Sequence, residues 1–121
     1  VVHCADQGTK ADALSQAGVR LIRCAAGDAG RLDIGDALRQ LGSAGLTRVL
    51  CEGGAGVAAA LLQAGQVDAL VGYSAGRVFG AGGTPAVGAL PGDAALSALA
   101  EFDLAGMAQL GDDIVHHWRR R

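Results

Sequence analysis

The chain has 121 residues, of which 50% are hydrophobic and 3% aromatic, a composition that suits one compact domain with an aliphatic core, spanning 1–121. Its formal net charge of -2 provides no general attraction to nucleic acid or to anionic lipid. No apolar run approaches the roughly 20 residues that span a bilayer, so we expect a soluble, cytoplasmic protein without nucleic-acid or membrane partners.

The first part of the chain alternates strand-like and helical patterns. Val1 to Cys4 predicts a strand, Thr9 to Ala17 predicts a helix that ends before Gly18, and Val19 to Cys24 predicts a second strand. A right-handed crossover places two such strands parallel to each other. Because the sequence opens directly in a strand, we expect it to be part of a longer domain.

A second helix is predicted to begin after Asp33, whose carboxylate suits an N-cap, and to end at Gly45. Apolar residues recur along it at i, i+3, i+4 and i+7, namely Ile34, Ala37, Leu38 and Leu41. Leu46 to Cys51 then has the apolar character of a parallel strand that is covered on both faces.

Glu52, Gly53 and Gly54 follow this predicted strand and precede a short Ala-rich helix that ends at Gly65. A strand end, a tight turn and a helix N-terminus leave free N–H groups that can receive a phosphate. The spacing is neither G-x-G-x-x-G nor a Walker A loop, so a close-packed turn is an equal alternative. Glu52 favours a ligand site, because an acid beside a helix N-terminus can bind ribose hydroxyls.

The second part of the chain changes from alternating elements to a hairpin. Asp68 to Ser74 predicts a strand, and the glycine-rich stretch 80–85 predicts irregular structure. A short helical segment is expected at 93–99. Phe102 to Leu110 and Ile114 to Trp118 predict an antiparallel hairpin that turns at Gly111-Asp112-Asp113. We therefore expect an α/β fold with a mixed, mostly parallel sheet, a C-terminal antiparallel hairpin and flanking helices.

Cysteines and histidines show no catalytic or metal-binding spacing. The three cysteines, Cys4, Cys24 and Cys51, lie in apolar runs and are expected to be buried, reduced thiols. His116 and His117 are adjacent on a predicted strand, so their side chains point to opposite faces and at most one of them can face a ligand. Structural or surface roles are the favoured interpretation for both.

Two sets of arginines carry the remaining candidate chemistry. Arg77, between a strand and a glycine-rich loop, is equally suited to bind a phosphate or to pair with Asp68. The run Arg119 to Arg121 is interpreted as a solvated chain end in preference to a binding patch.

Several of these motifs, in this order, resemble the reductase domain of bifunctional riboflavin biosynthesis proteins, within the dihydrofolate-reductase-like superfamily. The resemblance includes Val49 to Gly54 with the following Ala/Leu helix, the stretch Arg77 to Pro85, and the closing Gly111-Asp112-Asp113. It covers essentially the whole chain. The sequence departs from the family at Ala69, where the family has an acid, and at Gly76, where it has a proline.

The resemblance implies a dihydrofolate-reductase-like fold and NADPH-dependent reduction of 5-amino-6-(5-phosphoribosylamino)uracil to the ribityl product. It implies that Glu52 contacts the substrate. It also implies that NADPH is held by the turn and the first helical residues, namely Gly53, Gly54, Ala55, Gly56, Val57, Ala58, Ala59 and Ala60.

The family supplies further substrate and cofactor contacts from a front part of the domain that would precede Val1, so we expect the N-terminal part to be missing here. The zinc ligands of the family's deaminase domain are also absent from these residues. One alternative is a non-catalytic fragment whose sheet edge pairs with a second copy, as a homodimer, or with the missing half. Another is a related reductase with a different pteridine or pyrimidine substrate.

Overall fold

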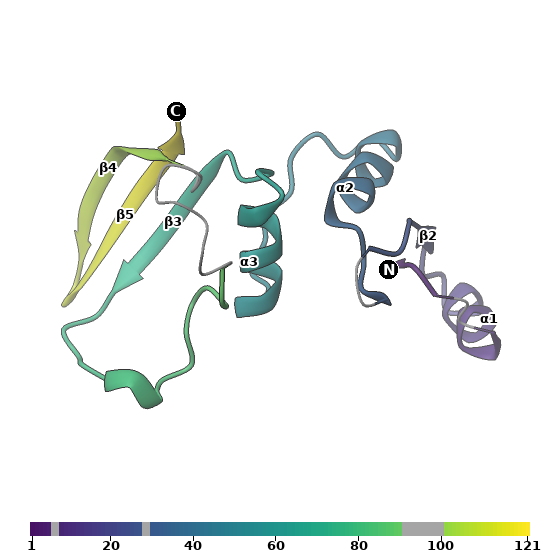
Figure 1. The fold of residues 1–121 in the computed structure, drawn as a ribbon, viewed down its shortest axis with the longest axis horizontal. Helices are drawn as coiled ribbons and strands as arrows, with labels where there is room; N and C mark the ends of the chain where they lie inside the picture. The colour runs from purple at the N-terminus through teal and green to yellow at the C-terminus, as the bar shows by residue number, and fades with distance from the viewer. Residues whose placement is uncertain (6–7, 28–29, 91–100) are drawn as a thin grey trace. The chain divides into compact units, whose positions relative to one another are not determined.

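The computed structural model describes residues 1–5, 8–27, 30–90 and 101–121. The chain forms two compact units, Val1–Cys51 and Glu52–Arg121 (Figure 1). The helical segment expected at 93–99 lies outside the described residues. In the part that the structure describes, every helix is too short or too polar to cross a membrane.

The first unit contains a small parallel sheet. Its strands β1 (Val2–His3) and β2 (Ile22–Arg23) are joined through α1 (Thr9–Gln16). Val2 lies opposite Ile22 in parallel register, which confirms the expected strand–helix–strand arrangement. β2 is shorter than the apolar run 19–24 because β1 offers only two residues for pairing.

Helix α2 (Ile34–Ser43) begins at the predicted N-cap. The Asp33 Oδ1 atom accepts a hydrogen bond from the Asp36 N–H at 2.7 Å, and Ala37 is the buried residue of the helix. The Asp36 carboxylate in turn accepts the Ala25 N–H at 2.6 Å and so ties the helix to the segment after β2. This backbone hydrogen bond, with a smaller contribution from Arg39, holds the pKa of Asp36 below its usual range.

We expect the first unit to loosen on acidification through Asp36. A carboxylate with a depressed pKa in the folded state stabilises the fold fully above its unfolded pKa of about 3.9, and the contribution is lost as the pH falls through the lower folded value. The Ala25 amide should therefore lose hydrogen-exchange protection between about pH 5 and about pH 2. In Asp36→Asn this pH-dependent loss should disappear, and equal protection of wild-type Ala25 at both pH values would contradict the prediction.

The expected strand over Leu46 to Cys51 is not formed. These residues have no regular structure, and Leu46, Val49 and Leu50 have 50%, 51% and 80% of their surface exposed. A parallel strand covered on both faces needs neighbouring strands to pair with, and no described strand pairs with this run.

The second unit is built on a three-stranded antiparallel sheet in the order β3-β5-β4 (Figure 1). It contains α3 (Ala55–Gln63), β3 (Ala69–Ser74), a 3-10 turn η2 (Gly80–Gly82), β4 (Phe102–Leu110) and β5 (Asp113–Arg120). The predicted hairpin is confirmed, and its turn places Gly111 at φ 61, a left-handed conformation that favours glycine. Parallel pairing is thus confined, among the described strands, to β1 and β2.

The C-terminal arginines are exposed, as expected of a solvated chain end, but they are an ordered part of this unit and not a free tail. β5 continues through Arg119 and Arg120, and the Arg120 guanidinium donates to the Gly65 carbonyl after α3. Arg121 donates to Asp103 at 2.6 Å and to Glu101 at 2.7 Å. The run therefore joins β5 to β4 and to the end of α3.

Few residues are buried in the described part of the chain, and the buried hydrophobic residues are Cys24, Ala37, Ala59 and Val115. The expectation of buried thiols is correct for Cys24, where burial raises the pKa of the thiol, whereas Cys4 is half-buried. It is wrong for Cys51, which is exposed because the run that ends at Cys51 does not form a covered strand.

His116 has a structural role, as expected, on one face of the sheet. Its Nδ1 accepts the Trp118 indole N–H at 2.7 Å, and its Nε2 lies 3.3 Å from the Ser74 hydroxyl. Because the indole nitrogen is only a donor, the neutral imidazole carries its proton on Nε2. The two rings meet edge to face with centroids 5.9 Å apart, and the ring of His116 covers Gly72 on β3.

Candidate functional site

The expected glycine turn leads directly into α3. Gly54 is the N-cap, with extended backbone angles of φ -67 and ψ 176, and no side chain caps the helix. Its carbonyl accepts the N–H groups of Val57 at 3.0 Å and Ala58 at 3.2 Å. Within the described residues, the N–H groups of Ala55 and Gly56 make no hydrogen bond. The first turn of α3 therefore offers two free donors at the positive end of the helix dipole.

The outer side of this turn is open. A Cβ built on Gly54 or Gly56 meets no atom within 4 Å, and 45% of Val57 is exposed. Glu52 is exposed as well, and in the described part of the chain its carboxylate has neither an ion pair nor a hydrogen bond. A carboxylate and two N–H donors thus lie within a few residues of each other, and none of them has a partner in the part of the chain that the structure describes.

The inner side of α3 is fixed by the loop around Gly88. The Gly88 N–H donates to the Ala55 carbonyl at 2.8 Å, and a Cβ on Gly88 would lie 3.0 Å from that oxygen. Ala59 is buried, and its Cβ would lie 3.6 Å from a Cβ on Gly88. The role of Gly88 could not be predicted from the sequence, because its close approach to Ala55 brings together two segments that are distant in the chain. Its effect is to hold the first turn of α3 in place.

The residues expected at the cofactor site, Gly53 to Ala60, are consequently divided between two sides. Gly53, Gly54, Gly56 and Val57 are exposed, whereas Ala58 and Ala60 are half-buried and Ala59 is buried. The exposed side can accept an anion through backbone N–H groups and a hydroxyl-bearing group through Glu52. The alanines on the inner side pack the helix in position.

Arg77 does not pair with Asp68, so this expectation is wrong. Asp68 directly precedes β3 and Arg77 follows it, and six strand residues separate their two ends by about 20 Å. Arg77 lies exposed in the loop after β3, and the ion pairs found in the described residues do not include it. Its alternative role, binding a phosphate, stays a prediction.

The described residues do not form a recognisable metal-binding site. Among them, no group of three or more histidine, cysteine, aspartate or glutamate side chains is placed to hold a metal ion. The binding groups of the turn are therefore a carboxylate and backbone amides alone.

Comparison with known proteins identifies the family of this arrangement. The model of the RibD C-terminal domain family matches residues 3–116. Two solved structures of Acinetobacter baumannii RibD, form 2 and form 1, each have a TM-score of 0.71 and 22% identity to the chain. Each alignment covers 91% of this chain but 29% of the Acinetobacter chain, so the present chain spans less than a third of those proteins. No curated protein sequence matches. The likeness confirms the expected dihydrofolate-reductase-like α/β fold. The expectation of one mostly parallel sheet is wrong for the described strands, which form a two-stranded parallel sheet and a three-stranded antiparallel sheet.

Proposed function

The chain belongs to the RibD C-terminal domain family, and from this premise we propose that it is part of an NADPH-dependent reductase of riboflavin biosynthesis. The substrate that we propose is 5-amino-6-(5-phosphoribosylamino)uracil, which the reaction reduces to its ribityl counterpart. The observation that carries the proposal is the open first turn of α3, where the N–H groups of Ala55 and Gly56 and the carboxylate of Glu52 have no partner among the described residues.

The residues of this turn fit a dinucleotide cofactor. The N–H groups of Ala55 and Gly56 can donate to a phosphate of NADPH, and the absence of side chains at Gly53, Gly54 and Gly56 lets the phosphate approach the backbone. NADPH, when bound, supplies the hydride, so the protein has to bind and orient and needs no nucleophile of its own. Val57, which is exposed, continues the proposed cofactor segment along α3, and Ala58 to Ala60 support this segment from the inner side of the helix.

Glu52 is proposed to bind the substrate. Its carboxylate can accept hydrogen bonds from ribose hydroxyls or from N–H groups of the uracil ring. Because Glu52 directly precedes the glycines, a substrate bound there lies beside the proposed cofactor turn, so one short segment would hold both reactants.

Titration of the purified 121-residue chain with NADPH tests the proposal. We expect nicotinamide fluorescence to rise and to saturate as the cofactor leaves water. An unchanged signal at millimolar NADPH would contradict cofactor binding by this chain.

The change Glu52→Gln separates substrate binding from cofactor binding. In the complete enzyme we expect the KM for the pyrimidine substrate to rise about tenfold, because a charge-assisted hydrogen bond is replaced by a neutral one, while the Kd for NADPH changes less than about twofold. Glu101→Gln is the matched control, because Glu101 is the only other glutamate and pairs with Arg121. An equal loss of substrate and cofactor binding in Glu52→Gln would mean that the residue holds the turn.

A second candidate function is assembly through the sheet edge. Within the described residues β4 pairs only with β5, and 54% of Leu104 and 68% of Met107 are exposed. We propose that, if NADPH does not bind, the chain acts by pairing this edge with a second copy. Sedimentation velocity tests this alternative: a monomer at all concentrations contradicts it, and a dimer that Met107→Lys dissociates supports it.

A further inference from the structure

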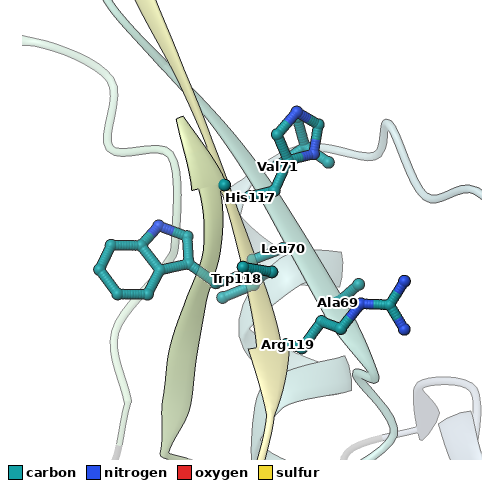
Figure 2. Close-up of a pocket in the computed structure, with 8 residues that line it drawn as sticks. Ala69, Leu70, Val71, His117, Trp118 and Arg119 are labelled. Atoms are coloured by element: carbon teal, nitrogen blue, oxygen red, sulfur yellow. The ribbon is translucent and has the colours of Figure 1, made fainter. Parts of the chain in front are cut away.

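A hollow of about 320 Å³ lies over the antiparallel sheet of the second unit, between β3, β5 and β4 (Figure 2). Its lining includes two side chains that can carry positive charge, His117 and Arg119, and the apolar residues Ala69 and Val71. Figure 2 shows His117 beside Val71 and Arg119 beside Ala69 on the same side of the sheet, whereas the Trp118 ring points to the other side.

The hollow exists because small residues meet at an irregularity of β4. The register of β4 against β5 shifts between Leu104 and Gly106, which marks a β-bulge. Gly106 pairs with His117, and a Cβ built on Gly106 would meet nothing within 4 Å. Ala105 and Ala69 also contribute only methyl groups to the lining. The space above His117 is therefore left open by the sequence.

Arg119 differs from the two arginines that follow it, because it has no partner among the described residues. Arg120 donates to the Gly65 carbonyl, and Arg121 donates to Asp103 and Glu101. Asp103 is also the residue opposite Arg119 in the β4–β5 register, so the nearest acid across the sheet is already bound. In the described residues the Arg119 guanidinium stands at the hollow without a hydrogen bond or ion pair, while Arg121 binds both carboxylates of this corner, Asp103 and Glu101.

We propose that this hollow binds a phosphate monoester that carries a small apolar group. A guanidinium presents paired N–H donors that match phosphate oxygens, and an imidazole two residues away on the same strand face, about 7 Å along the strand, can donate to a further oxygen. Val71 and Ala69 provide an apolar wall for the rest of the ligand.

The hollow is separate from the cofactor turn within the same unit. It lies at the start of β3, which the short connection 64–68 joins to the C-terminal end of α3, whereas the glycine turn is at the N-terminal end of this helix. The proposal therefore goes beyond the reductase function and does not depend on it.

Nuclear magnetic resonance of the isotope-labelled 121-residue chain tests the site with phenyl phosphate, inorganic phosphate and, at equal ionic strength, chloride. We expect saturable shifts of the His117 ring and the Arg119 side chain with both phosphates and not with chloride. Phenyl phosphate should bind about threefold or more tightly than inorganic phosphate, because its ring covers Val71. Arg119→Gln should weaken phenyl phosphate binding about tenfold.

Two further variants keep the outcome clear. Gly106→Val fills the hollow without a backbone clash and should also weaken binding, whereas Arg20→Gln, an exposed arginine of the first unit, should leave it unchanged. The proposal is overturned if chloride gives the same shifts, if Arg20→Gln weakens binding as much as Arg119→Gln, or if only the amides of Ala55 and Gly56 respond. The last outcome would support the cofactor turn while rejecting the hollow.

Discussion

Gly54→Val should lower the affinity for NADPH about a hundredfold without unfolding the chain. The backbone of Gly54 has φ -67, which valine adopts, and a Cβ at this position meets no atom within 4 Å. The added side chain instead occupies the space in front of the free N–H groups of α3. Loss of two charge-assisted hydrogen bonds to phosphate corresponds to about 3 kcal/mol, hence the expected factor.

The measurement is the nicotinamide fluorescence titration, repeated on wild-type, Gly54→Val and a control. Gly42→Val is a suitable control, because Gly42 lies in α2 of the first unit and a Cβ there also meets nothing within 4 Å. Circular dichroism should show the same helix and strand content in wild-type and Gly54→Val. Unchanged NADPH affinity in Gly54→Val would show that the turn does not bind the phosphate. The turn would then serve only to pack α3 closely.

Local sequence patterns predicted those structural elements that are determined by interactions between residues close together in the chain. Asp33 caps α2 because its side chain reaches an amide three residues ahead, and Gly111 closes the hairpin because the turn needs a left-handed residue. The glycine turn was predictable for the same reason: Glu52 to Gly56 are contiguous in the sequence and need only a helix start to be brought together.

Features that depend on distant partners could not be predicted in this way. The apolar run Leu46 to Cys51 has the composition of a buried strand, but strand formation depends on neighbours that the sequence pattern does not specify. In the sequence, Arg120 and Arg121 have the pattern of a charged chain end. Only the fold shows that Arg120 donates to the Gly65 carbonyl and that Arg121 donates to the Asp103 carboxylate. The hollow at Arg119 likewise needs three strands and a bulge to come together.

Gly72→Ala should destabilise the chain by about 2 to 3 kcal/mol, although it adds a single methyl group. A Cβ at this position would overlap Cε1 of the His116 ring, well inside van der Waals contact. The imidazole cannot move aside freely, because the Trp118 indole and the Ser74 hydroxyl hold its two nitrogens. Relief of the clash therefore breaks hydrogen bonds worth about 1 kcal/mol each and adds the strain of overpacking.

Urea unfolding of wild-type, Gly72→Ala and Gly106→Ala measures this effect. Gly106 lies in the same sheet, but its Cβ direction is open, so Gly106→Ala should remain within about 1 kcal/mol of wild-type. Removing the ring should remove the conflict: in a double-mutant cycle, Gly72→Ala and His116→Ala should show a favourable coupling of about 2 kcal/mol. The Trp118 indole N–H resonance should shift in Gly72→Ala, because its acceptor is displaced. Additive free energies, or an unmoved indole resonance, would show that the His116 ring is not what excludes a side chain at Gly72.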